Sequence, residues 1–165
     1  MAEQLSYAQK ELTEALLSLL EEKKLNDITI SELCSKAGLS RLSYYRNYDS
    51  MEEIIRAHLS GLTDSFLDSS AVNFRTTPRE EFITLLFEHM HDIKDLVSLL
   101  IDNNLSYLLK EEFDDAFARS VDIYNDPYRC YAASGAYFNL FYYWFRNGCK
   151  ENPSEVSTML DGFLA

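Results

Sequence analysis

Cysteine, proline and glycine are scarce in this sequence, with three, three and five copies among 165 residues. The three cysteines, Cys34, Cys130 and Cys149, are odd in number and far apart, which suits neither a disulfide framework nor a zinc site. No segment alternates apolar and polar residues for long enough to form a strand. The sequence therefore predicts an all-α protein whose cysteines are ordinary buried or half-buried thiols.

Long hydrophobic runs are also missing. A membrane span needs roughly 18 uncharged apolar residues, and the best candidate, residues 130–145, is shorter and contains Ser134 and Asn139. The opening MAEQLSYAQKEL has neither the basic segment nor the apolar segment of a secretion signal. We therefore expect a cytoplasmic protein with no membrane partner.

Positive charge is in short supply, and its distribution is uneven. The chain has 15 Lys and Arg against 27 Asp and Glu, a formal net charge of -12. Residues 1–60 have seven basic against ten acidic side chains, whereas residues 61–165 have eight against seventeen. The first part can therefore still bind nucleic acid, with weaker non-specific affinity than a basic protein would have.

No group of residues predicts catalysis. The sequence shows no serine, histidine and acid in a nucleophilic arrangement and no glycine-rich phosphate loop. His89 and His91 are two residues apart, so they would point to opposite sides of a helix, which is a poor geometry for one metal ion. We expect neither enzymatic activity, nor a metal site, nor a cofactor.

Apolar periodicity and capping signals predict about nine helices. Each proline follows a good capping residue, in TTPREE, NDPYR and ENPSEV, and so marks the first residue of a helix. The second and third helices are too short to be stable alone, so the first and fourth must hold them. The predicted helices span residues 6–22, 29–37, 41–47, 50–69, 78–91, 93–101, 104–119, 127–148 and 153–164.

The segment of residues 29–47 predicts a helix-turn-helix. Gly38 supplies a left-handed residue that ends one helix, and Ser40 caps the next, an arrangement that lets the second helix enter the DNA major groove. Tyr44 and Tyr48 share the inward face, because they are four residues apart. The outward face can then contact DNA, with arginines that pair with guanine edges or phosphates and a tyrosine hydroxyl that reaches a phosphate.

The segment ITISELCSKAGLSRLSYYRNYDSMEEI resembles the DNA-binding domain of the TetR (tetracycline repressor) family of transcriptional regulators. The resemblance covers about 50 residues and rests on the positions of Thr29, Ala37, Gly38, Ser43, Tyr45 and Tyr48. It implies a DNA-binding domain at residues 1–50 and, at residues 51–165, a helical domain that dimerises and often binds a small effector. The candidate DNA-binding residues are Thr29, Ser31, Ser40, Arg41, Leu42, Ser43, Tyr45, Arg46 and Asn47.

The sequence departs from the family pattern in two places. The family usually has a phosphate-binding lysine one residue after the cap of the fourth helix, where this sequence has Met51. Family members often have a basic arm before the first helix, and Lys10 is the first basic residue here. The resemblance therefore implies that one phosphate contact is missing.

The segment PYRCYAASGAYFNLFYYWFRNG predicts an interface helix. Its small residues allow a partner helix to approach closely, and its aromatic side chains offer a large area to bury. The family resemblance implies that the last two helices of two subunits form a four-helix bundle; the alternative is a helix buried wholly within its own subunit. The candidate interface residues are Tyr128, Tyr131, Ala132, Gly135, Phe138, Tyr142, Phe145 and Met159.

An effector pocket would lie among the fourth to eighth helices, with Phe87, Tyr107 and Phe113 as candidates, although aromatic residues there are more often plain core. Together these features predict a homodimeric regulator of a palindromic operator, a repressor released by a small effector. The first alternative is an activator that works through a protein partner. The second is a helical interaction module with weakened DNA binding.

Overall fold

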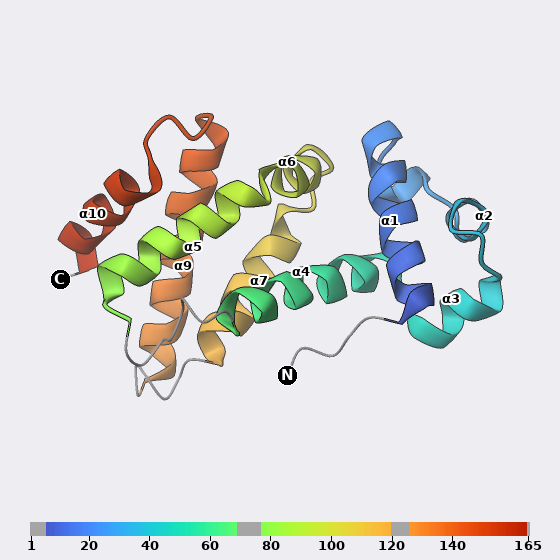
Figure 1. Cartoon of the computed structure of the whole chain (residues 1–165), viewed down its shortest axis with the longest axis horizontal. Coiled ribbons are helices and arrows are strands. Elements are labelled where there is room, and N and C mark those ends of the chain that lie inside the picture. The colour runs from blue at the N-terminus through green and yellow to red at the C-terminus, as the bar shows by residue number, and fades with distance from the viewer. Residues whose placement is uncertain (1–5, 69–76, 120–125, 165) are drawn as a thin grey trace. The chain divides into compact units, whose positions relative to one another are not determined.

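The computed structural model describes residues 6–68, 77–119 and 126–164. Across these ranges the chain forms nine α-helices, one short 3₁₀ turn and no strand, which confirms the predicted all-α class. The elements, shown in Figure 1, are α1 (Tyr7–Glu22), η1 (Leu25–Asp27), α2 (Ile30–Lys36), α3 (Arg41–Asn47), α4 (Met51–Leu67), α5 (Arg79–Asp92), α6 (Lys94–Asp102), α7 (Ser106–Ala118), α9 (Pro127–Arg146) and α10 (Pro153–Leu164).

The predicted helix limits agree with these bounds within two residues, and residue 69, the predicted end of the fourth helix, lies outside the described residues. Pro127 and Pro153 are the first residues of their helices, as predicted. Pro78 instead precedes α5 as its cap residue, and its side chain offers no capping hydrogen bond. The 3₁₀ turn η1 was not predicted, because three residues are too few to show a period.

Three helices end in the same left-handed turn, at Gly38 (φ 65°) after α2, Asn104 (φ 61°) after α6 and Gly148 (φ 78°) after α9. In each turn, the following residue donates its N–H to the carbonyl five residues earlier, over 2.9, 2.8 and 3.0 Å respectively. This is the Schellman geometry, which satisfies the last carbonyls of a helix and reverses the chain. The role predicted for Gly38 is confirmed.

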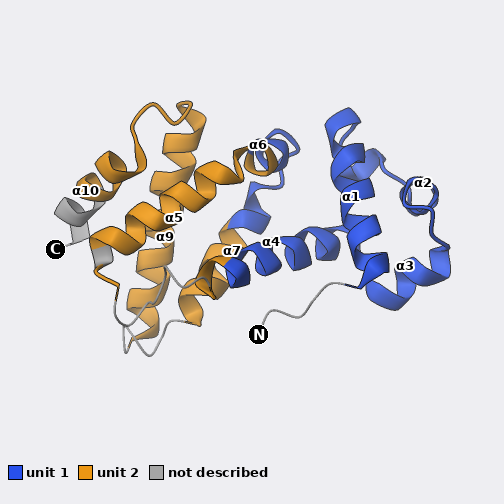
Figure 2. Cartoon of the chain, in the orientation of Figure 1, with its two compact units in different colours: residues 1–65, 98–109 blue, residues 66–97, 110–165 orange. Residues whose placement is uncertain are grey.

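Two compact units divide the chain, as Figure 2 shows. Unit 1 comprises residues 1–65 and 98–109, and unit 2 comprises residues 66–97 and 110–165. The chain crosses between the units within α4, α6 and α7. The predicted boundary after residue 50, between a DNA-binding and a dimerisation domain, does not coincide with the division into compact units. It stays a prediction.

In unit 1, α1 packs against α2 and α3, and these two short helices pack against each other. The apolar stripe of α1 and the inward faces of α2, α3 and α4 supply a shared core, which stabilises helices too short to fold alone. Its fully or almost fully buried side chains include Leu12, Leu16, Leu33, Cys34, Tyr44, Ile54 and Ile55.

In unit 2, α5 packs against α10, and rings from α5, α7 and α9 form an aromatic core. The Ser157 hydroxyl of α10 donates to the carbonyl of Glu80 in α5 over 2.9 Å. The Trp144 indole N–H donates to the carbonyl of Glu151 over 2.8 Å, which fixes the turn between α9 and α10. Nowhere in the described ranges is a helix long and apolar enough to cross a membrane.

Candidate nucleic-acid interface

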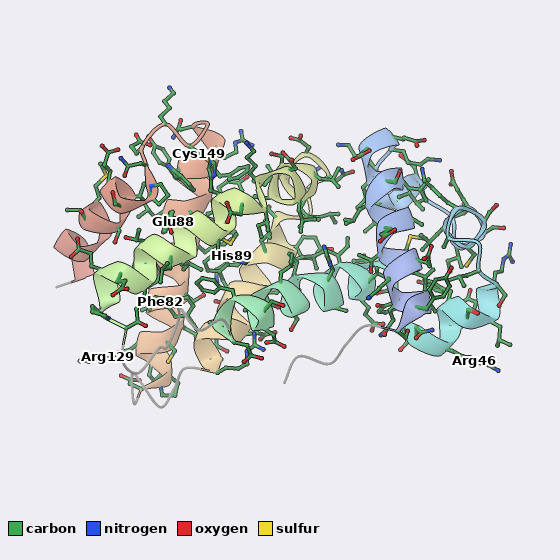
Figure 3. All side chains as sticks on the ribbon, in the orientation of Figure 1. Arg46, Phe82, Glu88, His89, Arg129 and Cys149 are labelled. Atoms are coloured by element: carbon green, nitrogen blue, oxygen red, sulfur yellow. The ribbon has the colours of Figure 1, made fainter. Side chains whose placement is uncertain are left out.

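Helix α3 has one buried and one exposed side, as its sequence predicts. Tyr44 is 1% exposed and Tyr48 is buried, whereas Tyr45 is 58% exposed and both Arg41 and Arg46 are exposed. Figure 3 shows the Arg46 side chain extending from α3 away from α1. The rings of Tyr44 and Tyr45 meet edge to face, with centroids 5.2 Å apart, so the buried tyrosine supports the exposed one.

Several of the candidate polar side chains hold the helix-turn-helix together. The Thr29 hydroxyl accepts the N–H of Glu32 over 3.2 Å, and the Ser40 hydroxyl accepts the N–H of Ser43 over 3.1 Å. The Asn47 amide donates to the Ser43 carbonyl over 2.7 Å. These groups cap or close α2 and α3, so any contact that they make with DNA comes in addition to a structural role.

Arg41 and Arg46 have no such internal role. No other residue in the described ranges forms a hydrogen bond or an ion pair with either guanidinium group. Leu42 and Ser31 are also exposed. The outward side of α3 therefore presents two unpaired cations, an apolar side chain and a phenol, which are groups that contact bases and phosphates in a groove.

Two lysines of unit 1, Lys23 and Lys36, are paired with carboxylates. Lys23 lies 2.5 Å from the Glu32 carboxylate, and Lys36 lies 3.1 Å from that of Glu22. The hydrogen bond between Lys23 and Glu32 raises the pKa of the lysine and lowers that of the glutamate. Both pairs join α1 or its C-terminal cap to α2, whereas α3 has two arginines and no acidic side chain.

Met51, which replaces the lysine that the family resemblance implies, has a packing role. Its side chain is 9% exposed and belongs to the core of unit 1, although it is the first residue of α4. The same turn is already capped, since the Ser50 hydroxyl accepts the Glu53 N–H over 3.2 Å and the Glu53 carboxylate accepts the Asp49 N–H over 2.7 Å. A lysine at position 51 would have to leave the core to reach a phosphate. Met51 is therefore a packing residue, and the missing phosphate contact stays a prediction.

The predicted interface residues divide between two roles. Tyr128, Tyr131, Ala132 and Met159 are exposed, and Gly135 and Tyr142 are half-buried. Phe138 and Phe145 are also half-buried, and three candidates pack within the subunit: the Phe138 ring lies 5.6 Å from that of Phe113 and 5.9 Å from that of Tyr142, and the Phe145 ring lies 5.7 Å from that of Phe141.

Sequence reasoning missed Tyr143, which is 69% exposed. It lies fifteen residues after Tyr128, close to a whole number of turns of 3.6 residues, so the helical period could have placed both tyrosines on one side of α9. The opposite side of α9 is buried, through Cys130, Ala133, Ser134, Tyr137, Phe141 and Trp144.

The three candidate effector residues belong to two different units, and their role stays a prediction. Phe87 and Phe113 both contact Phe141, with centroids 6.4 and 5.8 Å apart, and belong to the aromatic core of unit 2. Tyr107 belongs to unit 1 and is half-exposed. His89 stacks on Phe66, with centroids 4.7 Å apart. No group of three metal-binding side chains occurs in the part of the chain that the structure describes.

Comparison with known proteins supports these features. No family model matches the chain. A curated relative, the "Uncharacterized HTH-type transcriptional regulator YxbF" of Bacillus subtilis (strain 168), is 26% identical over 168 residues, covering 91% of this chain and 43% of the relative. The chain thus spans less than half the length of that relative.

Two solved structures have a similar fold over nearly the whole chain. A TetR-family transcriptional regulator from Streptomyces coelicolor matches with a TM-score of 0.56 and 16% identity, covering 96% of this chain and 78% of that one. The regulator FadR from Bacillus subtilis, in complex with stearoyl-CoA, matches with a TM-score of 0.53 and 12% identity, covering 92% and 94%. The chain has the fold of TetR-family regulators, and the predicted resemblance is confirmed at this level.

Proposed function

We propose that this protein is a homodimeric transcriptional regulator that reads a palindromic operator with α3 and represses transcription until a small molecule releases it. The observation that carries the proposal is the outward side of α3, where Arg41, Tyr45 and Arg46 are exposed on a helix whose other side is anchored in the core. The name of the curated relative, an HTH-type transcriptional regulator, supports the same function.

The position of α3 in unit 1 suits its entry into the major groove of DNA. The reading helix crosses the preceding helix through a glycine turn and is held by α1, so its outward side chains are presented on a rigid support. Arginine is suited to guanine because its guanidinium can donate two parallel hydrogen bonds to O6 and N7. A two-fold dimer would present two such helices to half-sites about one helical turn apart, which is why we propose a palindromic site.

For the dimer we propose the exposed side of α9, joined by α10. Tyr128, Tyr131 and Tyr143 are large exposed aromatic residues, and Ala132 and Gly135 between them permit close approach. A side chain added at Gly135 would meet no atom within 4 Å in its own subunit, so the space beside it is open to a partner. Burial of these rings provides a favourable free energy of association.

For the effector we propose a hydrophobic small molecule that binds beside the aromatic core of unit 2, near Phe87 and Phe113. The similar regulator FadR was solved with stearoyl-CoA. A long-chain acyl-CoA is therefore the first compound to test, with the free fatty acid and coenzyme A as separate controls.

Selection from a random pool of DNA duplexes tests the proposed function. We expect the protein to enrich a palindromic sequence, and a gel shift on that sequence should weaken when the effector is added. Failure to enrich any sequence, by a protein that is folded and dimeric, would contradict the proposal and favour a helical interaction module.

A further inference from the structure

A polar hollow of about 240 Å³ lies within unit 1, apart from the outward side of α3. Its walls come from the turn around η1, from the first turn of α4 and from the corner between α6 and α7, where Asn104 adopts its left-handed conformation. The volume equals that of roughly eight water molecules and is below the usual range for drug-sized ligands. A ligand of this hollow must therefore be small.

Asn103, in the wall of this hollow, has an unused hydrogen-bond acceptor. The residue is 8% exposed, and its amide nitrogen donates to the carbonyls of Leu20 and Leu99, over 3.1 and 2.9 Å. A 180° flip of the amide would place its oxygen next to two carbonyl oxygens, which repel it. The hydrogen bonds therefore determine the orientation of the amide. Its Oδ1 is then buried without a hydrogen-bond partner among the described residues, although buried polar atoms nearly always have one.

Two opposite charges line the same hollow. The Lys24 ammonium donates one hydrogen bond to the carbonyl of Asp102 and has two further N–H groups. The half-buried Glu52 contributes a carboxylate, and neither side chain forms an ion pair with another described residue. A simple anion would be repelled by Glu52 and a simple cation by Lys24, whereas a molecule with both charges would be attracted to both.

We propose that this hollow binds a free amino acid. The ammonium of the ligand donates to Glu52, and its carboxylate accepts from Lys24, while Asn103, whose Oδ1 has almost no exposed surface, forms part of the wall. Leu25 and Leu105, both buried at the edge of the hollow, offer an apolar surface to the stem of the ligand's side chain. The site is independent of the proposed effector site in unit 2, and it does not rest on DNA binding.

Thermal unfolding of the whole protein in the presence of each standard L-amino acid tests this site. A ligand that binds only the folded state raises the unfolding temperature as its concentration rises, so we expect at least one amino acid to do so at millimolar concentration. Calorimetric titration then gives its affinity. The N-acetyl and carboxamide derivatives of that amino acid, each of which lacks one charge, should bind at least tenfold more weakly.

Four variants locate the site. Glu52→Gln and Lys24→Met should each weaken binding at least tenfold, with each variant compared with its own unliganded form. Glu21→Gln and Lys10→Met remove the same charges from exposed positions on α1 outside the hollow, and they should bind as the parent does. The proposal is overturned if no amino acid changes the unfolding temperature, or if binding survives unchanged in both Glu52→Gln and Lys24→Met.

Discussion

Two tyrosines four residues apart decide which side of α3 faces outward. Tyr44 is almost completely buried, and Tyr48 lies one helical turn further on the same side. The exposure of Arg41, Tyr45 and Arg46 follows from that anchoring rather than from any property of the arginines themselves. Single residues in this segment thus have separate tasks, because some hold the helix and others are left available to a partner.

Met51→Lys tests the packing role of Met51. A lysine at a 9% exposed position must either bury its charge or displace α4, so we expect the free energy of unfolding to fall by about 1–3 kcal/mol. Urea unfolding measures this, with Met51→Leu as a control that should change stability by less than about 1.5 kcal/mol. A stable Met51→Lys protein with tighter DNA binding would show instead that this helix end can offer a lysine to the phosphates.

Some residue roles could be predicted from the sequence and others could not. The two sides of α3 follow from the helical period. The turn at Gly38 follows from glycine's tolerance of positive φ. The burial of Met51 and the unpaired oxygen of Asn103 depend on contacts between segments distant in sequence, such as Asn103 with Leu20. No local pattern encodes those contacts.

At the scale of elements, a glycine that ends a helix differs from a glycine inside a helix in its backbone conformation. Gly38 has a φ of 65° and open space around it, while Gly61 lies in the interior of α4, also with open space. The two glycines therefore differ in backbone conformation and not in crowding. That difference makes them a matched pair.

Gly38→Ala and Gly61→Ala should change stability in opposite directions. The first forces alanine into the left-handed region and should lower the free energy of unfolding by about 1–2 kcal/mol. The second improves helix propensity and should raise it by about 0.5–1 kcal/mol. Urea unfolding of both variants checks this, and a destabilised Gly61→Ala protein would mean that α4 needs a glycine for a reason other than its own helix.

Two histidines should make the stability depend on pH. Burial lowers the pKa of His58 on α4 and of His89 on α5 below the usual 6.5, with Asp92 partly opposing the shift of His89. Below pH 6.5 the unfolded chain then binds more protons than the folded chain, so the free energy of unfolding should fall as the pH falls through this value. Denaturant unfolding from pH 7.5 to pH 5 should show a shallower fall for His58→Gln and His89→Gln. An unchanged slope in both variants would show that burial of these rings does not control it.

At the scale of the whole molecule, the exposed aromatic side of α9 supports the proposed dimer. An apolar surface of this kind is more often an interface than a solvated surface. We expect a two-fold dimer at micromolar concentration in sedimentation experiments. Tyr131→Glu places two like charges near each other across the interface and should weaken the dimer at least tenfold.

Tyr7→Glu is the control for that experiment, since Tyr7 is also an exposed tyrosine but lies on α1. It should leave the dimer intact. A parent protein that stays monomeric, or a Tyr131→Glu variant that dimerises as the parent does, would place the interface elsewhere or remove it.

DNA affinity shows whether α3 reads the operator. Fluorescence anisotropy measures the affinity of the selected operator for the parent, for Arg41→Ala and for Arg46→Ala over a range of salt concentrations. If these arginines read bases, each variant should lose about 1–3 kcal/mol of binding free energy on the operator and much less on unrelated DNA. If they bind phosphate, the loss of binding free energy should be similar on both DNAs, and the affinity should depend less steeply on salt. Lys150→Ala removes an exposed positive charge from unit 2 and should bind as the parent does. Folded variants that lack either arginine, yet bind operator and unrelated DNA with the parent's affinity and salt dependence, would show that α3 does not read DNA.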